Sequence, residues 1–190
     1  MNITLTPEAM AIIEAEQRTV RLLTEAGFPT DTRKRREVIG ALMTGCLPNK
    51  EKKGADCYMM VEGKKLPCER KSNAGFKSGG ELKNPSGAFT GLSLQDTKDE
   101  QRKYMIRKVG EMHRVWFDNF DPNTGALSQV WWMTGEKALE ILWPIVERKW
   151  DNLTEIKNKG GKLPKDPRLD ANISWTKIQK HGHNFELPVI

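Results

Sequence analysis

A chain of 190 residues is long enough for one domain with a buried core, and we expect a single domain over residues 1–190. It has no apolar run that approaches a membrane span, no N-terminal signal layout, and an odd number of cysteines that argues against a secreted disulfide scaffold, so we expect a cytoplasmic protein with no membrane partner. The formal charge of +6 favours a polyanionic partner, although ribosomal and membrane-surface proteins share such a charge.

Two helices are predicted before residue 46. The first begins at Thr6 and Pro7, with proline at the first helical position, and ends at Gly27. The second begins near Asp31 or Thr32 and ends at residue 45. It opens on the basic residues Arg33, Lys34, Arg35 and Arg36. These side chains either follow a phosphate backbone or form a solvated helix face, and the sequence favours neither interpretation.

Residues 55–72 form the most informative segment, because they predict a β-hairpin. If Glu62 and Gly63 are its two-residue turn, with Gly63 at a positive φ, residues whose numbers sum to 125 face each other. Asp56 then pairs with Glu69 at the closer of the two antiparallel spacings, with Cβ atoms about 4.5–5.5 Å apart. Lys71 lies two residues beyond Glu69 and therefore on the same face.

The other face of this hairpin has the character of a core side. It carries Cys57, Met59, Val61, Leu66 and Cys68. We expect the cysteines, Cys46 included, to be reduced thiols, because their spacing matches no zinc pattern.

Two carboxylates held face to face repel each other unless a cation lies between them. Carboxylate oxygens suit Mg²⁺, which usually takes one or two protein carboxylates, keeps several waters and contacts a phosphate. A neighbouring lysine can orient the attacking water and neutralise charge that develops on phosphorus. The pair Asp56 and Glu69 with Lys71 therefore indicates a magnesium-dependent phosphodiesterase.

The run Gly-Ala-Asp, strand, turn, strand, Glu-Arg-Lys-Ser resembles the PD-(D/E)xK nuclease signature of type II restriction endonucleases, with Ala55 where that family has proline. The resemblance implies an α/β fold with a mixed central β-sheet flanked by helices. It also implies Mg²⁺ bound by Asp56, Glu69 and the carbonyl of Arg70, and DNA as the substrate. Glu37, on the preceding helix, matches an acidic position that often completes such catalytic sites.

The expected function is that of a type II restriction endonuclease, which cuts a specific double-stranded DNA sequence as a homodimer. A structure-selective or repair nuclease on the same scaffold is the alternative within the enzyme class. A non-catalytic nucleic-acid-binding protein is the alternative outside it.

A second Glu-x-Lys copy, Glu81 with Lys83, competes with the first. It lies among glycines and a proline, which is loop rather than strand chemistry, so we prefer the first copy. In the same loop, polar side chains suited to phosphates or base edges are Asn73, Lys77 and Asn84.

The remaining chain predicts further elements and a C-terminal extension over 157–190. These are a short strand at 92–94, a helix capped by Asp96 or Thr97 and reaching Met112, a hairpin of 114–117 with 126–133, a helix over 135–150 interrupted at Pro144, and an edge strand at 173–178. The tryptophans follow the periodicity of these elements, so core packing is preferred to base stacking. The His-Gly-His-Asn sequence at 181–184 is expected in a DNA-contacting or exposed tail.

Overall fold

The protein was studied as a computed structural model that describes residues 5–25, 33–49, 54–165 and 167–188, with the side chains of 23, 24 and 33–35 outside the description. The helical elements are α1 (Pro7–Glu25), α2 (Arg33–Met43), α3 (Lys98–Met105), the π-helical turn η1 (Ile106–Gly110), α4 (Gly135–Asn158) and α5 (Trp175–His181). The strands are β1 (Leu47–Pro48), β2 (Cys57–Val61), β3 (Lys64–Ala74), β4 (Gly87–Phe89), β5 (Arg114–Phe120), β6 (Leu127–Met133), β7 (Ala171–Ile173) and β8 (His183–Phe185).

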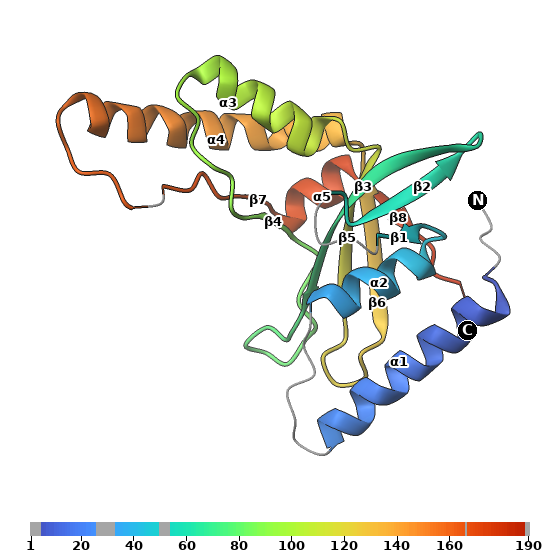
Figure 1. Ribbon diagram of the computed structural model, residues 1–190. Coiled ribbons are helices and arrows are strands. Elements are labelled where there is room, and N and C mark those ends of the chain that lie inside the picture. Colours follow the sequence, from blue (N-terminus) through green and yellow to red (C-terminus); the bar gives the residue numbers. More distant parts are fainter. Residues whose placement is uncertain (1–4, 26–32, 50–53, 166, 189–190) are drawn as a thin grey trace.

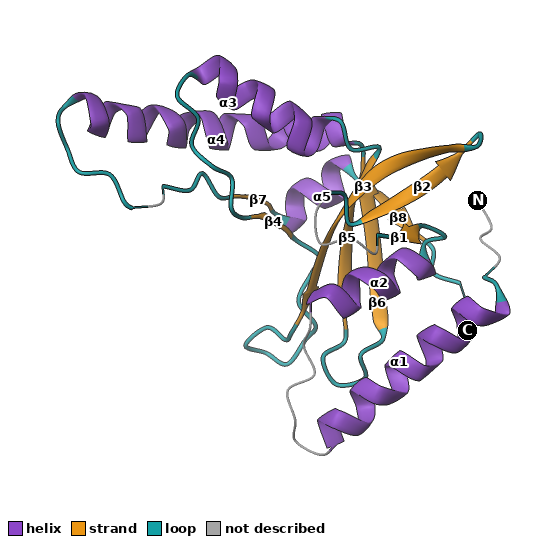
Figure 2. Cartoon of the chain, in the orientation of Figure 1, coloured by secondary structure: helices purple, strands orange, loops and turns teal. Residues whose placement is uncertain are grey.

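A six-stranded mixed sheet forms the centre of the fold, with the strand order β1-β2-β3-β5-β6-β8 (Figure 2). Only β3 and β5 run parallel, and every other neighbouring pair in this sheet is antiparallel. The parallel pair requires a crossover, which α3 and η1 supply between the two strands. The α/β class and the mixed central sheet expected from the sequence are therefore confirmed.

The two faces of the sheet are covered by different helices (Figure 1). Strand β5 alternates between them: Val115 and Phe117 pack into a core with residues of α3, η1, α4 and α5, whereas Trp116 packs into a second core with residues of α1 and α2. Because β3 pairs in register with β5, Glu69 and Lys71 share the face of Val115 and Phe117. Strand β3 thus presents its odd-numbered residues toward the α3 side and its even-numbered residues toward α2.

Local signals at the helix starts behave as expected. Thr6 accepts a hydrogen bond from the backbone N–H of Ala9, with Pro7 as the first residue of α1. Thr97 and Glu100 form a reciprocal capping box at the start of α3. The predicted end of the first helix at Gly27 and the predicted start of the second helix near Asp31 or Thr32 lie outside the described residues. The expected helix to Met112 changes to a π-helical turn at Ile106.

Three expectations after residue 90 are wrong. Helix α4 runs unbroken through Pro144, whose ring is exposed, so water can satisfy the carbonyl that lacks an N–H partner. The segment expected as a strand at 173–178 leaves β7 at Ile173 and forms α5, because Ile178 is buried against the sheet from a helix. Instead of a strand at 92–94, a single bridge joins Ser93 to Arg168.

The sequence at 181–184 is exposed at His183 and Asn184, as expected, but it belongs to an edge strand and not to a tail. Strand β8, which contains His183, pairs with β6 at the sheet edge, and the ring of His183 stacks on Trp132 at 4.5 Å between centroids. Trp116 is fully buried and packs edge-on against Phe185, which confirms core packing for this tryptophan. All three cysteines are free and buried, as predicted. Among the described residues, no helix is both long and apolar enough for a transmembrane segment.

Candidate active site

The β2–β3 hairpin has the predicted register from its turn to Cys57 and Cys68, where the ladder ends; the predicted pair of Asp56 with Glu69 lies just beyond it. Val61 pairs with Lys64 and Cys57 pairs with Cys68, so paired numbers sum to 125. Glu62 and Gly63 form the turn with φ values of 49° and 76°, the left-handed conformation that a type I′ turn requires at both positions. The alternation of faces that the sequence predicted therefore holds along the paired part of the hairpin.

Asp56 lies directly before β2 and is tied to β3 twice. Its backbone N–H donates to the carbonyl of Cys68 at 3.1 Å, and its Oδ2 accepts from the backbone N–H of Arg70 at 2.8 Å. Since the N–H and C=O of one extended residue point to the same side of a strand, the Arg70 carbonyl is directed toward the edge where Asp56 lies. Strand β3 continues past this point to Ala74 without β2 beside it.

Glu69 and Lys71 form a close ion pair on the α3 side of β3. The Lys71 Nζ lies 2.5 Å from the Glu69 Oε1. The side chain of Lys71 is 8% exposed and that of Glu69 is 20% exposed. The ammonium also lies over the Phe89 ring, 4.6 Å from its centroid. Phe89 limits the space around Lys71, so the amine is held toward the acidic groups and not toward bulk solvent.

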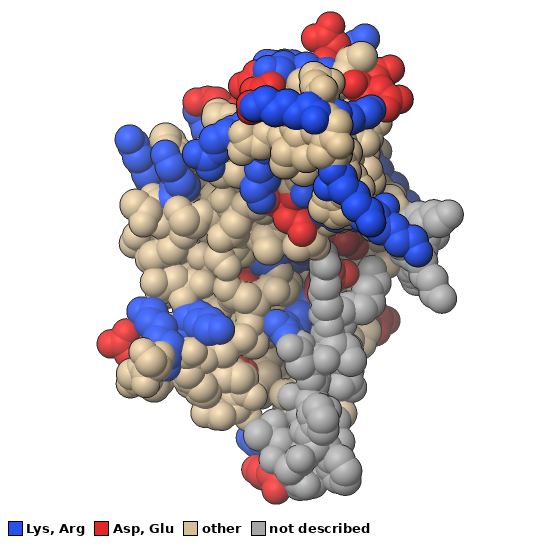
Figure 3. Space-filling model, turned by 90° about the vertical axis from the view of Figure 1, so that its left-hand side faces the viewer, with Lys and Arg blue, Asp and Glu red and all other residues tan. Residues whose placement is uncertain are grey.

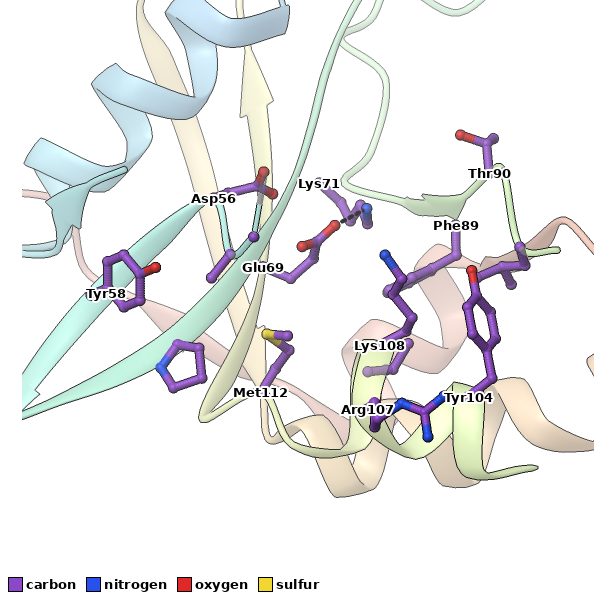
Figure 4. A pocket seen from close by; sticks show the side chains of 16 residues that line it. Asp56, Tyr58, Glu69, Lys71, Phe89, Thr90, Tyr104, Arg107, Lys108 and Met112 are labelled. Carbon is purple, nitrogen blue, oxygen red and sulfur yellow. Dashed lines mark hydrogen bonds and ion pairs between the residues drawn. The ribbon is translucent and has the colours of Figure 1, made fainter. Parts of the chain in front are cut away.

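These groups line a cavity of about 550 Å³ (Figure 4). Its charged and aromatic lining comprises Asp56, Tyr58, Glu69 and Lys71 from the hairpin region, Phe89 from β4, Tyr104 from α3, and Arg107 and Lys108 from η1. In Figure 4 the side chains of Glu69, Lys71 and Lys108 point toward one another, and Asp56 lies beside them across β3. The hairpin forms one wall and the α3–η1 crossover forms the other.

Arg70 points away from this cavity and is completely buried on the α2 side. Its guanidinium forms a bidentate ion pair with Asp118 of β5: Nε donates to Oδ2 at 2.8 Å and Nη2 donates to Oδ1 at 2.6 Å. Nη1 donates to the hydroxyl of Thr44 at the end of α2, at 2.9 Å. The backbone N–H that donates to Asp56 therefore belongs to Arg70, whose side chain is anchored on the other face of β3 by a buried ion pair with Asp118.

The pKa values of Arg70 and Asp118 are set by their burial and by each other's charge. Burial raises the pKa of the Asp118 carboxyl, and the guanidinium of Arg70 opposes that rise. Burial alone would lower the pKa of Arg70, but the Asp118 carboxylate raises it on balance, so the arginine keeps its charge. Ser72 donates a further hydrogen bond to Asp118 Oδ2 at 3.2 Å.

Glu37 does not line the cavity. It is 6% exposed on α2, and α2 packs on the side of β3 that carries Arg70: a Cβ on Gly40, one turn later, would lie 2.8 Å from the Arg70 Nε. Glu69 and Lys71 point to the opposite side. The supporting metal role expected for Glu37 is untested and has no support in this geometry.

The residues predicted to contact nucleic acid are dispersed. Asn73 links β3 to the segment before β4, because its Nδ2 donates a hydrogen bond to the Asn84 carbonyl at 3.0 Å. Lys77 is exposed and pairs with Glu81 at 3.1 Å. Arg36 is half-buried at α2, and burial lowers the pKa of its guanidinium. Lys34 and Arg35 have side chains outside the description.

The second Glu-x-Lys copy lies away from the cavity. Glu81 and Lys83 are both exposed and flank Leu82, which bridges to Phe76 in the segment after β3. Neither belongs to the cavity lining, whereas both members of the first copy do. The geometry therefore favours Glu69 with Lys71.

The second wall of the cavity was missed from the sequence. Arg107 and Lys108 belong to a segment that the sequence identified only through its apolar side. Their position depends on the parallel pairing of β3 with β5, which returns the chain over the same face. The local signal, two adjacent basic residues at the end of a helix, is too common to indicate a site without that pairing.

The donor set at this edge fits a hard cation. Among the described residues, no cluster of three or more His, Cys, Asp and Glu side chains forms a metal cage. Two carboxylates and a backbone carbonyl, with water in the other positions, are the ligands that Mg²⁺ commonly accepts. The chain matches no known family model, and no curated protein is detectably similar to it in sequence.

Proposed function

We propose that this chain is a Mg²⁺-dependent DNA endonuclease with a restriction-endonuclease-like core. The observation that carries the proposal is the gathering of Asp56, Glu69 and Lys71 in one cavity, at the point where β2 stops and β3 continues with an open edge. Asp56, Glu69 and the Arg70 carbonyl would hold the metal.

When bound, Mg²⁺ would lower the pKa of a water molecule and neutralise charge on the phosphate. The remaining roles, metal binding and orientation of the phosphate and the water, would belong to protein side chains. Asp56 is oriented by the amide of Arg70, which leaves its Oδ1 to meet another ligand. Lys71, held against Glu69 and Phe89, would donate to a phosphate oxygen and orient the water that attacks phosphorus.

The substrate proposed is double-stranded DNA. The formal charge of +6 supports a polyanion, and one site per chain supports a symmetric homodimer that cuts both strands of a palindromic sequence.

The experiment is cleavage of supercoiled plasmid DNA by the purified protein, with Mg²⁺ and with EDTA. Discrete Mg²⁺-dependent fragments are expected. Cleavage confined to branched or mismatched substrates would support the repair alternative instead. A gel shift without cleavage on any substrate would contradict the enzyme assignment and support a binding protein.

A further inference from the structure

The π-helical turn η1 is a rigid support for two basic side chains. Val109 is 1% exposed in the core, and a Cβ on Gly110 would lie 2.9 Å from the Leu139 Cδ2 of α4. At the start of α4, a Cβ on Gly135 would lie 2.3 Å from the carbonyl oxygen of Val109. The backbone of η1 is therefore held against α4 at contact distance, and π-helical turns of this kind occur often at functional sites.

Arg107 and Lys108 both line the cavity; in Figure 4 the amine of Lys108 points toward Glu69 and Lys71, whereas the guanidinium of Arg107 is turned away from them. Both are exposed, and no acidic side chain within 4 Å of either is found in the described part of the chain. Two of the three basic residues of the preceding helix have partners: Lys98 pairs with Asp151 at 2.7 Å, and the guanidinium of Arg102 lies over the Trp143 ring at 5.1 Å. Arg107 and Lys108 of η1 are therefore open to an external anion, although Lys108 also lies over the Tyr104 ring, 6.0 Å from its centroid.

The charges of the cavity favour an anionic occupant. Its acidic residues are Asp56 and Glu69, and its basic residues are Lys71, Arg107 and Lys108, so the lining carries a net charge of +1 before any metal binds. A bound Mg²⁺ would bring it to +3. Figure 3 shows Lys and Arg side chains gathered on one face of the molecule at the level of α3 and α4, and in a smaller group lower down.

We propose that Arg107 and Lys108 bind the backbone phosphates that flank the scissile one, on the same DNA strand. This proposal rests on the proposed function, because it takes the groups around Asp56 as the point of cleavage. The strand then runs between the hairpin wall and the η1 wall. Tyr104, which lines the cavity from α3, would pack against the sugar or base between those phosphates.

The test is DNA binding measured without cleavage, by fluorescence anisotropy of a labelled duplex in EDTA over a range of salt concentrations. The variants are Arg107→Ala, Lys108→Ala and the double substitution. The matched control is Lys103→Ala, which removes an exposed cation of α3 that does not line the cavity. Equal thermal midpoints for all four proteins verify their folding.

Each η1 variant is expected to bind about tenfold more weakly than the wild type, the loss typical of a charge-assisted hydrogen bond. The slope of log K against log salt should fall by about 0.9 for each single variant and about 1.8 for the double, with no change for Lys103→Ala. Variants that match the control, or a wild type that does not bind DNA, would overturn the proposal. So would displacement of the duplex by a mononucleotide at equal concentration, because the site would then take a free nucleotide.

Cleavage assays keep this inference separate from the proposed function. If the protein cuts DNA, the η1 variants should raise KM and leave kcat within a few-fold of the wild type, since they touch flanking phosphates only. Wild-type KM and Kd in these variants would refute the inference while the nuclease assignment stands. Lost binding in the variants of a protein that never cuts would refute the nuclease assignment while the phosphate contacts stand.

Discussion

Replacement of Asp118 by asparagine tests whether the buried charge pair behind the site supports it. Asp118 and Arg70 are both 0% exposed, and the carboxylate accepts hydrogen bonds from the Nε and Nη2 atoms of the guanidinium. Asp118→Asn keeps the shape but removes the charge, which leaves a guanidinium buried without a counter-ion. One of the two hydrogen bonds is also lost, because the new amide nitrogen is a donor facing a donor.

The cost follows from burial. Breaking a buried ion pair by removal of one partner typically destabilises a protein by 3–5 kcal/mol, so we expect about 4 kcal/mol. With a urea m-value of roughly 2 kcal/mol/M, the midpoint of unfolding should fall by about 2 M. The assay is equilibrium urea unfolding followed by tryptophan fluorescence, since Trp116 lies 5.2 Å from the Arg70 guanidinium and reports on this region.

Ser72→Ala is the matched control. It removes only the 3.2 Å hydrogen bond to Asp118 and should cost about 1 kcal/mol. If Asp118→Asn costs no more than Ser72→Ala, the pair does not carry the stability that its burial indicates, and the reasoning fails.

Lys71→Ala should remove most Mg²⁺-dependent cleavage whereas Lys83→Ala should not, and the reverse result in a plasmid assay would move the site to the second Glu-x-Lys copy. Gly40→Ala should lower the thermal midpoint, although alanine is usually favoured by about 1 kcal/mol inside a helix, because its Cβ would lie 2.6 Å from the Asp118 Oδ2; a raised midpoint would contradict the close packing of α2. Glu37→Ala should leave the Mg²⁺ midpoint of cleavage unchanged, because α2 covers the opposite face of β3; a raised Mg²⁺ requirement with 10–100-fold lower activity would restore it as a supporting ligand.

The hairpin was predictable because its signals are local. A two-residue turn with glycine, alternation of apolar and polar residues, and the numbering rule fix the register without knowledge of the rest of the chain. The same information placed Glu69 and Lys71 on one face. It did not predict that Asp56 would turn its carboxylate to the amide of Arg70, since that contact forms where the ladder ends.

The rest of the site depends on contacts between distant segments. Arg70 and Asp118 are 48 positions apart and meet only because β3 and β5 pair in parallel. The same pairing carries Arg107 and Lys108 over the face of β3 that holds Glu69 and Lys71. Sequence periodicity identifies which residues of an element are apolar, but it does not identify which strand lies beside which, so neither the buried pair nor the second wall could be derived.

The most direct test of the central claim is Mg²⁺-dependent DNA cleavage by Asp56→Asn and Glu69→Gln, measured beside the DNA affinity of the same proteins in EDTA. Both substitutions preserve shape and remove one negative charge from the cavity. The account predicts that cleavage is abolished in each variant, while affinity is equal to or higher than that of the wild type because less negative charge faces the phosphates. Near-wild-type cleavage by either variant would contradict the assignment of these two carboxylates as the metal ligands.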